Sequence, residues 1–215
     1  MFEKLLIAVG LKSKQPDWDN IPTLIAEALS THAENQDIAQ MSASEPGPVL
    51  RDVTWGRATW DLPLRDGRRV AMSVSGTTYL NDENFVVFVS ASKFYAVWWA
   101  LREFDRRGIC EFEQMPNNRK YGCQDEIWAR SNERPVPLAD VSYHDGYGIG
   151  FIDGITRTLW LLHNGASSFP VKVHGAKAAH AMHSAIGDDR FDPVTVESLM
   201  LMEDPTRQHT CEILS

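Results

Sequence analysis

The stretch GIGFIDGITRTLWLLHNGASSFPVKVH, residues 148–174, carries the clearest structural pattern in this 215-residue chain. Residues 148–152 have the length and apolar content of a short strand. Residues 155–163 are apolar on several sides, which is typical of a buried helix, and Gly165 can end it because glycine readily adopts the left-handed backbone of a helix end. Residues 169–173 alternate in polarity and predict a second strand. The stretch therefore predicts a strand, a turn, a helix and a strand in succession.

Strand-like segments precede this stretch and are either alternating or short and continuously apolar. The strands that we expect are residues 49–55, 58–64, 69–75 and 84–90. Asp66-Gly67 predicts a hairpin turn, because glycine tolerates the positive φ that such a turn requires. Pro135 and Pro137 bracket a short extended segment that continues through Val141. These strands predict a mixed sheet.

Helices are expected around the strands. Apolar residues three and four apart between Phe94 and Phe104 predict a helix that Ser90 or Ser92 caps and Gly108 ends. Further helices are expected at residues 121–130, 175–186 and 193–202. The pattern as a whole indicates the α/β class, in an α+β arrangement of a mixed sheet with packed helices.

The first 45 residues differ in composition from the remainder. Residues 1–11 and 22–32 show helical periodicity, and residues 34–48 are rich in Ser, Ala, Glu, Gln and Pro, which is typical of a linker or a loose loop. We therefore expect an N-terminal helical extension, residues 1–45, and an α/β domain, residues 46–215.

Composition and charge narrow the function classes. The formal net charge is −8, so the average surface repels a phosphate backbone and disfavours nucleic acid as a partner. The three cysteines, Cys110, Cys123 and Cys211, have no C-x-x-C spacing, which argues against a zinc knuckle and fits a reducing compartment. No apolar run approaches the roughly 20 residues of a spanning helix, so we expect a cytoplasmic protein without membrane insertion. No cofactor or metal is expected.

The turn Asp153-Gly154-Ile155-Thr156-Arg157 is the first candidate site. It lies between an expected strand and an expected helix, where free backbone N–H groups and the helix dipole favour an anion. Gly154 permits a tight turn, and the Arg157 guanidinium can fork onto a phosphate or a carboxylate. The alternative is structural: Asp153 caps the helix, Thr156 assists, and Arg157 pairs with Asp153 or another acid.

Arg119 and Lys120 are the second candidate, because two adjacent cations beside a polar turn can meet a phosphate or an acidic partner. The alternative is a solvated turn.

Histidine and cysteine offer weaker candidates. His180 and His183 share a helix face at a spacing that zinc ligands use, with His174 upstream, but surface histidines on an alanine-rich helix are the simpler interpretation. A nucleophilic site would need Cys123 to lie beside His144 or His163. No residue pattern locates a base or an oxyanion hole for such a site. The sequence has no P-loop motif.

Three segments together resemble a known family. They are PVPLADV (residues 135–141), GFIDGITRTLWLL (residues 150–162) and NGASSFPV (residues 164–171). They are similar to the plasmid fertility-inhibition factor family of the FiwA and FipA type over about residues 88–187, and Asn118-Arg119-Lys120 resembles the Arg-Lys position of that family. The resemblance implies a protein encoded on one conjugative plasmid that reduces transfer of a co-resident one by binding a TraG-type coupling protein of the type IV secretion system, without turnover.

A more distant resemblance concerns the fold. A strand, a D-G-x-x-R turn opening a helix, and a following Pro-Val strand are similar to the ParB/sulfiredoxin-like fold, in which a G-x-x-R turn cradles nucleotide phosphates. Carried over by position, Gly154 and Arg157 would be the phosphate residues. Ile155-Thr156 stands where sulfiredoxins carry a cysteine, so the redox reaction is not implied.

Three hypotheses about function follow. The first is a coupling-protein inhibitor that is not an enzyme, with an interface anchored by aromatic residues, for which Trp55, Trp60 and Trp128 are candidates. The second is a ParB/sulfiredoxin-like nucleotide-binding, NTPase or nuclease module that uses Arg157. The third is an immunity-type protein that neutralises a toxin, for which acidic charge is the sole support.

Overall fold

The computed structural model describes residues 20–31, 46–54, 56–76, 83–101, 109–118, 121–144 and 147–202. The predicted helix over residues 1–11 and most of the predicted linker lie outside these ranges. Within the described ranges, no helix combines the length and the apolar character that crossing a membrane requires.

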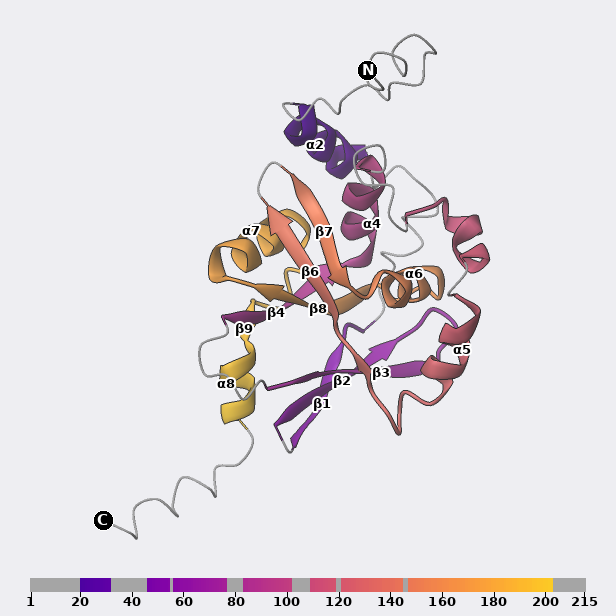
Figure 1. Cartoon of the computed structure of the whole chain (residues 1–215), viewed down its shortest axis with the longest axis vertical. Coiled ribbons are helices and arrows are strands. Elements are labelled where there is room, and N and C mark those ends of the chain that lie inside the picture. The colour runs from indigo at the N-terminus through magenta and orange to yellow at the C-terminus, as the bar shows by residue number, and fades with distance from the viewer. Residues whose placement is uncertain are drawn as a thin grey trace, which may run out of the picture.

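The strands form two mixed sheets (Figure 1). Sheet A has the order β1-β2-β3-β5, with β1 (Val49–Thr54), β2 (Arg57–Pro63), β3 (Arg69–Ser75) and β5 (Val136–Pro137). Sheet B has the order β7-β6-β8-β4-β9, with β4 (Asn84–Ser90), β6 (Ala139–His144), β7 (Gly148–Asp153), β8 (Ser168–His174) and β9 (Val194–Thr195). Pairing is parallel between β3 and β5 and between β6 and β8, and antiparallel elsewhere.

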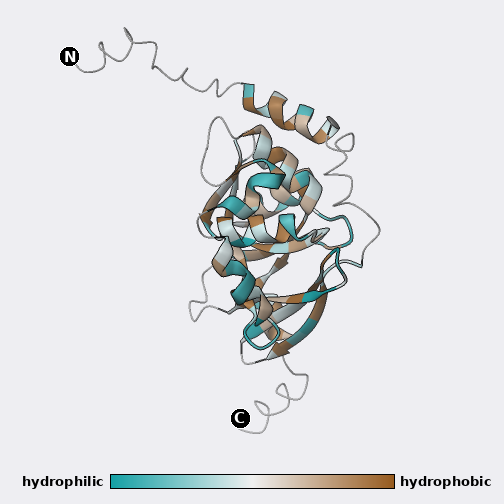
Figure 2. Ribbon diagram, turned by 90° about the vertical axis from the view of Figure 1, so that its right-hand side faces the viewer, coloured by the Kyte–Doolittle hydropathy of each residue, from teal (hydrophilic) through white to brown (hydrophobic). Residues whose placement is uncertain are grey.

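Helices surround the sheets. They are α2 (Ile21–Thr31), α4 (Ala91–Ala100), the 3-10 helix η3 (Phe112–Asn117), α5 (Gly122–Ala129), α6 (Ile155–His163), α7 (Ala176–Ile186) and α8 (Val196–Leu201). Figures 1 and 2 place α2 at the end of the molecule opposite sheet A. There α2 packs against α4 and adds Ile21 and Ile25 to the hydrophobic core, so the described part of the N-terminal region is not a detached arm.

One hydrophobic core connects both sheets. Trp60 of β2 meets Phe88 of β4 edge to face, with ring centroids 5.9 Å apart. Phe88 also stacks on Phe191 at 4.5 Å. Such aromatic pairs stabilise by about 0.5–1.5 kcal/mol beyond the area that they bury, so this contact helps to hold the two sheets together.

The predicted element types are confirmed for most of the described chain. The four early strands, the Asp66-Gly67 turn and the strand–turn–helix–strand unit all occur, and the α/β class of the prediction is correct. Gly67 has φ 82°, which explains why the hairpin carries glycine there.

Two local predictions need correction. Residues 194–195 form β9 instead of helix, and Thr195 caps α8 by accepting a 3.0 Å hydrogen bond from the Ser198 N–H. Ser90 occupies the N-cap position of α4 without a side-chain capping bond, because its hydroxyl pairs with that of Ser92 at 3.0 Å. The predicted end at Gly108 lies outside the described residues. The predicted division at residue 45 stays a prediction.

Candidate functional site

Gly154 forms the sharp turn between β7 and α6. Its φ is 101° and its ψ is 10°, a left-handed backbone conformation that costs energy for residues with a Cβ. A Cβ placed at Gly154 would lie 2.6 Å from the Cβ of Ala139 and 2.7 Å from its Cα. Glycine is therefore required here twice, by the backbone conformation and by the close approach of β6.

Arg157 is held by the turn that precedes it. Its Nη2 donates to Asp153 Oδ2 at 2.8 Å and to the carbonyl oxygen of Leu138 at 3.4 Å. The Arg157 side chain is 18% exposed, whereas that of Asp153 is 73% exposed. The predicted pairing of Arg157 with Asp153 is confirmed. The predicted cap is wrong, because Gly154 occupies the N-cap position and no side chain caps the helix.

The first turn of α6 has backbone N–H groups that are available to donate hydrogen bonds. The first intrahelical bond joins the Thr158 N–H to the Gly154 carbonyl at 3.0 Å, so the N–H groups of Ile155, Thr156 and Arg157 have no acceptor within the described structure. Arg157 Nε is also buried without a partner. These donors, together with the positive end of the helix dipole, can receive an anionic group.

The residues beside the turn come from another strand. Asp140 of β6 pairs in register with Asp153 and forms a 2.7 Å salt bridge to Lys172 of β8. Sequence reasoning missed Leu138, Ala139 and Asp140 as parts of the site, because the register of β6 against β7 is non-local. No local sequence pattern points to Ala139, because its contact with Gly154 depends on how β6 pairs with β7.

Of the other predicted site residues, the structure describes Trp60 and Trp128. Arg119 and Lys120 lie outside the described residues, as does Trp55. The structure corrects the interface assignment of Trp60 and Trp128, which are 3% and 2% exposed and pack in the core. Trp128 stacks on Trp160 with centroids 4.7 Å apart, so its ring is not offered to a partner.

Two of the histidine candidates, His163 and His183, form hydrogen bonds within the fold. His163 Nδ1 is 2.6 Å from the Tyr121 hydroxyl, and His183 Nε2 is 2.7 Å from the Phe191 carbonyl oxygen. Burial, with a smaller contribution from Arg65, lowers the pKa of His163, and burial raises the pKa of Tyr121 to about 12. Tyr121 therefore occupies one of the two ring nitrogens of His163.

Comparison with known proteins gives consistent results. The family model described as "Plasmid Fertility inhibition factor" matches residues 86–187. "Protein osa" of Shigella flexneri is 31% identical over 143 residues, which cover 65% of this chain and 74% of that protein.

A solved structure agrees. The crystal structure of Oncogenic Suppression Activity Protein, described there as a plasmid fertility inhibition factor and studied as a gold(I) cyanide derivative, superposes with a TM-score of 0.67 at 27% identity. The match covers 86% of this chain and 95% of that chain, so the similarity extends beyond the segment that the family model describes. The chain belongs to the plasmid fertility inhibition factor family.

Proposed function

We propose that this protein inhibits conjugative transfer of a co-resident plasmid by binding the TraG-type coupling protein that feeds the transfer channel. The supporting observation is family membership, which rests on the matching family model and the 31% identical relative. Binding without turnover is the expected mode of action, because a tight complex is sufficient to block a channel component.

The turn at Asp153–Arg157 is the proposed contact surface. The Asp153 carboxylate is largely exposed, and the open N–H groups of Ile155 and Thr156 lie beside it. The ion pair with Arg157 holds this carboxylate in place before a partner arrives, which reduces the entropy lost on binding. Arg119 and Lys120 are further proposed contacts with this partner.

Conjugation frequency tests this function. Donor cells carry a transferable plasmid and express either the wild-type chain, the double variant Asp153→Ala/Arg157→Ala, or Lys177→Ala, an exposed cation on α7 that serves as the matched control. We expect transfer to fall by orders of magnitude with wild type and Lys177→Ala and to recover with the double variant. Unchanged transfer in the presence of wild type, across several plasmid classes, would refute the proposal.

A direct binding assay tests the proposed partner independently of the effect on conjugation. Immobilised wild-type chain should retain purified coupling protein, and the double variant should retain much less at equal folded concentration. Inhibition of conjugation without retention of the coupling protein would leave the family function in place and reject this partner.

A second function has one observation in its favour. The open N–H groups at the start of α6, with Arg157 Nε buried and unpaired beside them, are suited to a nucleotide phosphate. If nucleotide binds, a hundredfold excess over Kd should stabilise the fold by about 2.7 kcal/mol, which a thermal shift detects readily. Arg157→Ala should abolish that shift while the unliganded variant stays folded. No shift with any nucleotide and Mg²⁺ would exclude this function.

A further inference from the structure

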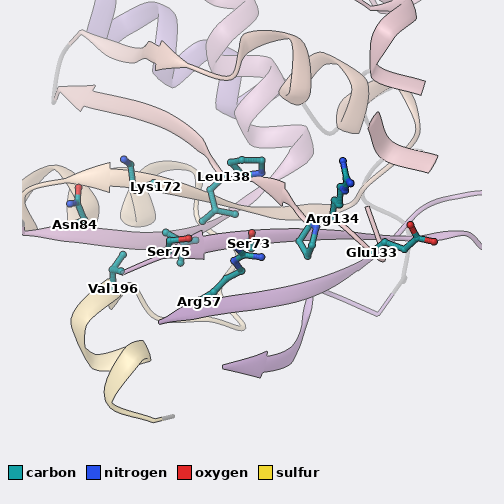
Figure 3. A pocket seen from close by; sticks show the side chains of 12 residues that line it. Arg57, Ser73, Ser75, Asn84, Glu133, Arg134, Leu138, Lys172 and Val196 are labelled. Carbon is teal, nitrogen blue, oxygen red and sulfur yellow. The ribbon is translucent and has the colours of Figure 1, made fainter. Parts of the chain in front are cut away.

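A groove lies where the two sheets meet, and Leu138 is one of the residues that line it. Its volume is about 480 Å³, and it is lined from sheet A by Arg57, Ser73 and Ser75 and from sheet B by Asn84 and Lys172. Figure 3 shows Arg57 reaching from β2 toward Ser73, while Asn84 and Lys172 approach from the opposite sheet. A cavity of this size suits a small ligand or a short peptide segment.

The groove continues along sheet A. A second cavity of about 390 Å³ shares Arg57, Glu133 and Pro135 with the first and extends over β1 past Asp52. The second cavity therefore continues the first across sheet A, from β3 over β2 to β1.

Two arginines of the groove are free to bind. Lys172 is paired with Asp140, and Arg51 of the adjoining cavity is held by Asp61 and by the backbone and side chain of Asn132. By contrast, the side chains of Arg57 and Arg134 form no hydrogen bond or ion pair with the rest of the described structure.

The net charge of the first cavity limits how much negative charge a ligand can carry. The lining carries three positive charges, on Arg57, Arg134 and Lys172, and one negative charge, on Glu133. Asp140, which lies outside the lining, neutralises Lys172 through its ion pair, so one positive charge remains. One carboxylate matches this balance, whereas a polyphosphate or a nucleic-acid strand brings more negative charge than the groove can neutralise.

The edge of β3 supplies backbone hydrogen-bonding groups to the same space. β5 pairs with β3 only at Met72 and Ser73, where the Ser73 carbonyl accepts from the Leu138 N–H at 3.0 Å. Because a strand repeats every two residues, the N–H and C=O of Ser75 point to the same side as those of Ser73, beyond the end of β5. Ser75 is the register partner of Arg57, so this open edge and the free guanidinium are neighbours.

We propose that this groove binds an extended peptide segment of a partner protein, which pairs with the Ser75 edge of β3 and places one carboxylate on Arg57. The mode is strand addition, in which backbone bonds give affinity and side-chain contacts give specificity. The inference goes beyond the proposed function, because peptide binding by the purified chain does not depend on which protein supplies the segment.

The test uses fluorescein-labelled peptides of alternating valine and threonine with one central glutamate, and the same peptide with glutamine as the control. Fluorescence anisotropy with the full chain should show the glutamate peptide binding about tenfold more tightly, since a charge-assisted hydrogen bond is lost with glutamine. Arg57→Ala should remove this difference, and Arg57→Glu should transfer the preference to a peptide with central lysine. Arg69→Ala, an exposed arginine of the same sheet outside the groove, is the matched control and should leave the difference intact.

Peptide chemistry tests the strand pairing without altering the protein. N-methylation of alternate residues on one edge of the peptide should abolish binding, and N-methylation on the opposite edge should be tolerated. Equal binding of all peptides by wild type and Arg57→Ala, or no binding at all, overturns the proposal. Displacement of the peptide from Arg57 by an oligothymidylate strand overturns it too, in favour of nucleic acid.

The conjugation assay keeps the two proposals distinct. If Arg57→Glu loses the glutamate peptide yet inhibits transfer like wild type, the groove binds peptide and does not serve the proposed function. If the wild-type chain binds the peptide and never inhibits transfer, the groove is a peptide-binding site and the proposed function is wrong.

Discussion

The two ends of helix α6 differ in how their polar groups are satisfied. At the C-terminal end, Asn164 Nδ2 donates to the Tyr121 hydroxyl at 3.0 Å and to the Trp160 carbonyl at 2.9 Å, and Trp160 Nε1 donates to Asp125 Oδ1 at 2.7 Å. At the N-terminal end, no side chain caps the helix, and Arg157 pairs with Asp153. A closed network rigidifies a fold, whereas open donors can bind a partner, so we expect one end to stabilise the fold and propose the other as a contact surface.

The strongest test of the closed end is Trp160→Ala. Trp160 is 1% exposed, stacks on Trp128 and joins α6 to α5 through Asp125. Truncating a buried aromatic side chain lowers the free energy of unfolding by about 3–5 kcal/mol, which urea denaturation measures. Ile152→Ala, at a position 69% exposed, is the control and should change stability by less than about 0.5 kcal/mol. A Trp160→Ala effect as small as that of the control would show that the closed end does not support the fold.

Gly154→Ala tests whether the open end needs its turn. The left-handed conformation and the overlap with Ala139 together predict a loss of about 2 kcal/mol or more of unfolding free energy. Gly67→Ala is the matched control, because Gly67 also has positive φ but a Cβ there meets nothing within 4 Å. Equal losses at the two positions would mean that contact with β6 contributes nothing to the turn.

The closed end should also make stability depend on pH. Burial, and to a smaller extent Arg65, holds the pKa of His163 below its ordinary 6.5, so the unfolded chain takes up this proton first. Stability from His163 is therefore complete above about pH 6.5 and is lost as pH falls toward the folded pKa. Urea unfolding across this window should show the decline in wild type and not in His163→Gln.

A second group, the Asp188 carboxylate, makes stability depend on pH in a more acidic range. Burial alone would raise the pKa of Asp188, but the hydrogen bonds from Arg190 outweigh it and hold that pKa below its usual 3.8. Its contribution to stability is therefore present above about pH 3.8 and lost below it. A decline that survives in His163→Gln around pH 6.5 would contradict the assignment to His163.

The smallest effect on stability is expected from Asp153→Asn. The Asp153 carboxylate is 73% exposed, and exposed ion pairs contribute less than about 1 kcal/mol. Thermal unfolding should therefore change little, while inhibition of conjugation should weaken if this end of α6 contacts the partner. A large loss of stability with inhibition unchanged would reverse the roles assigned to the two ends.

Local sequence patterns predicted much of this fold. Alternation and apolar spacing located β2, β3, β4 and α6 to within a residue or two, since each pattern reflects a period of about two or 3.6 residues. The same reasoning placed Arg157 with Asp153, because residues four apart on a helix turn are neighbours. It also assigned Asp153 the role of cap, which the left-handed Gly154 fills instead.

The order and type of the elements therefore follow from the amino-acid sequence, as do the charge, composition and motifs that point to the family. Which side chains are available to a partner depends instead on tertiary packing. Trp60 and Trp128 are buried, Arg157 is paired, and Arg57, which no motif marks, is free at the edge of a groove. The physical reason is that periodicity is a local property of the chain, whereas burial and pairing depend on the register of strands that lie far apart in sequence.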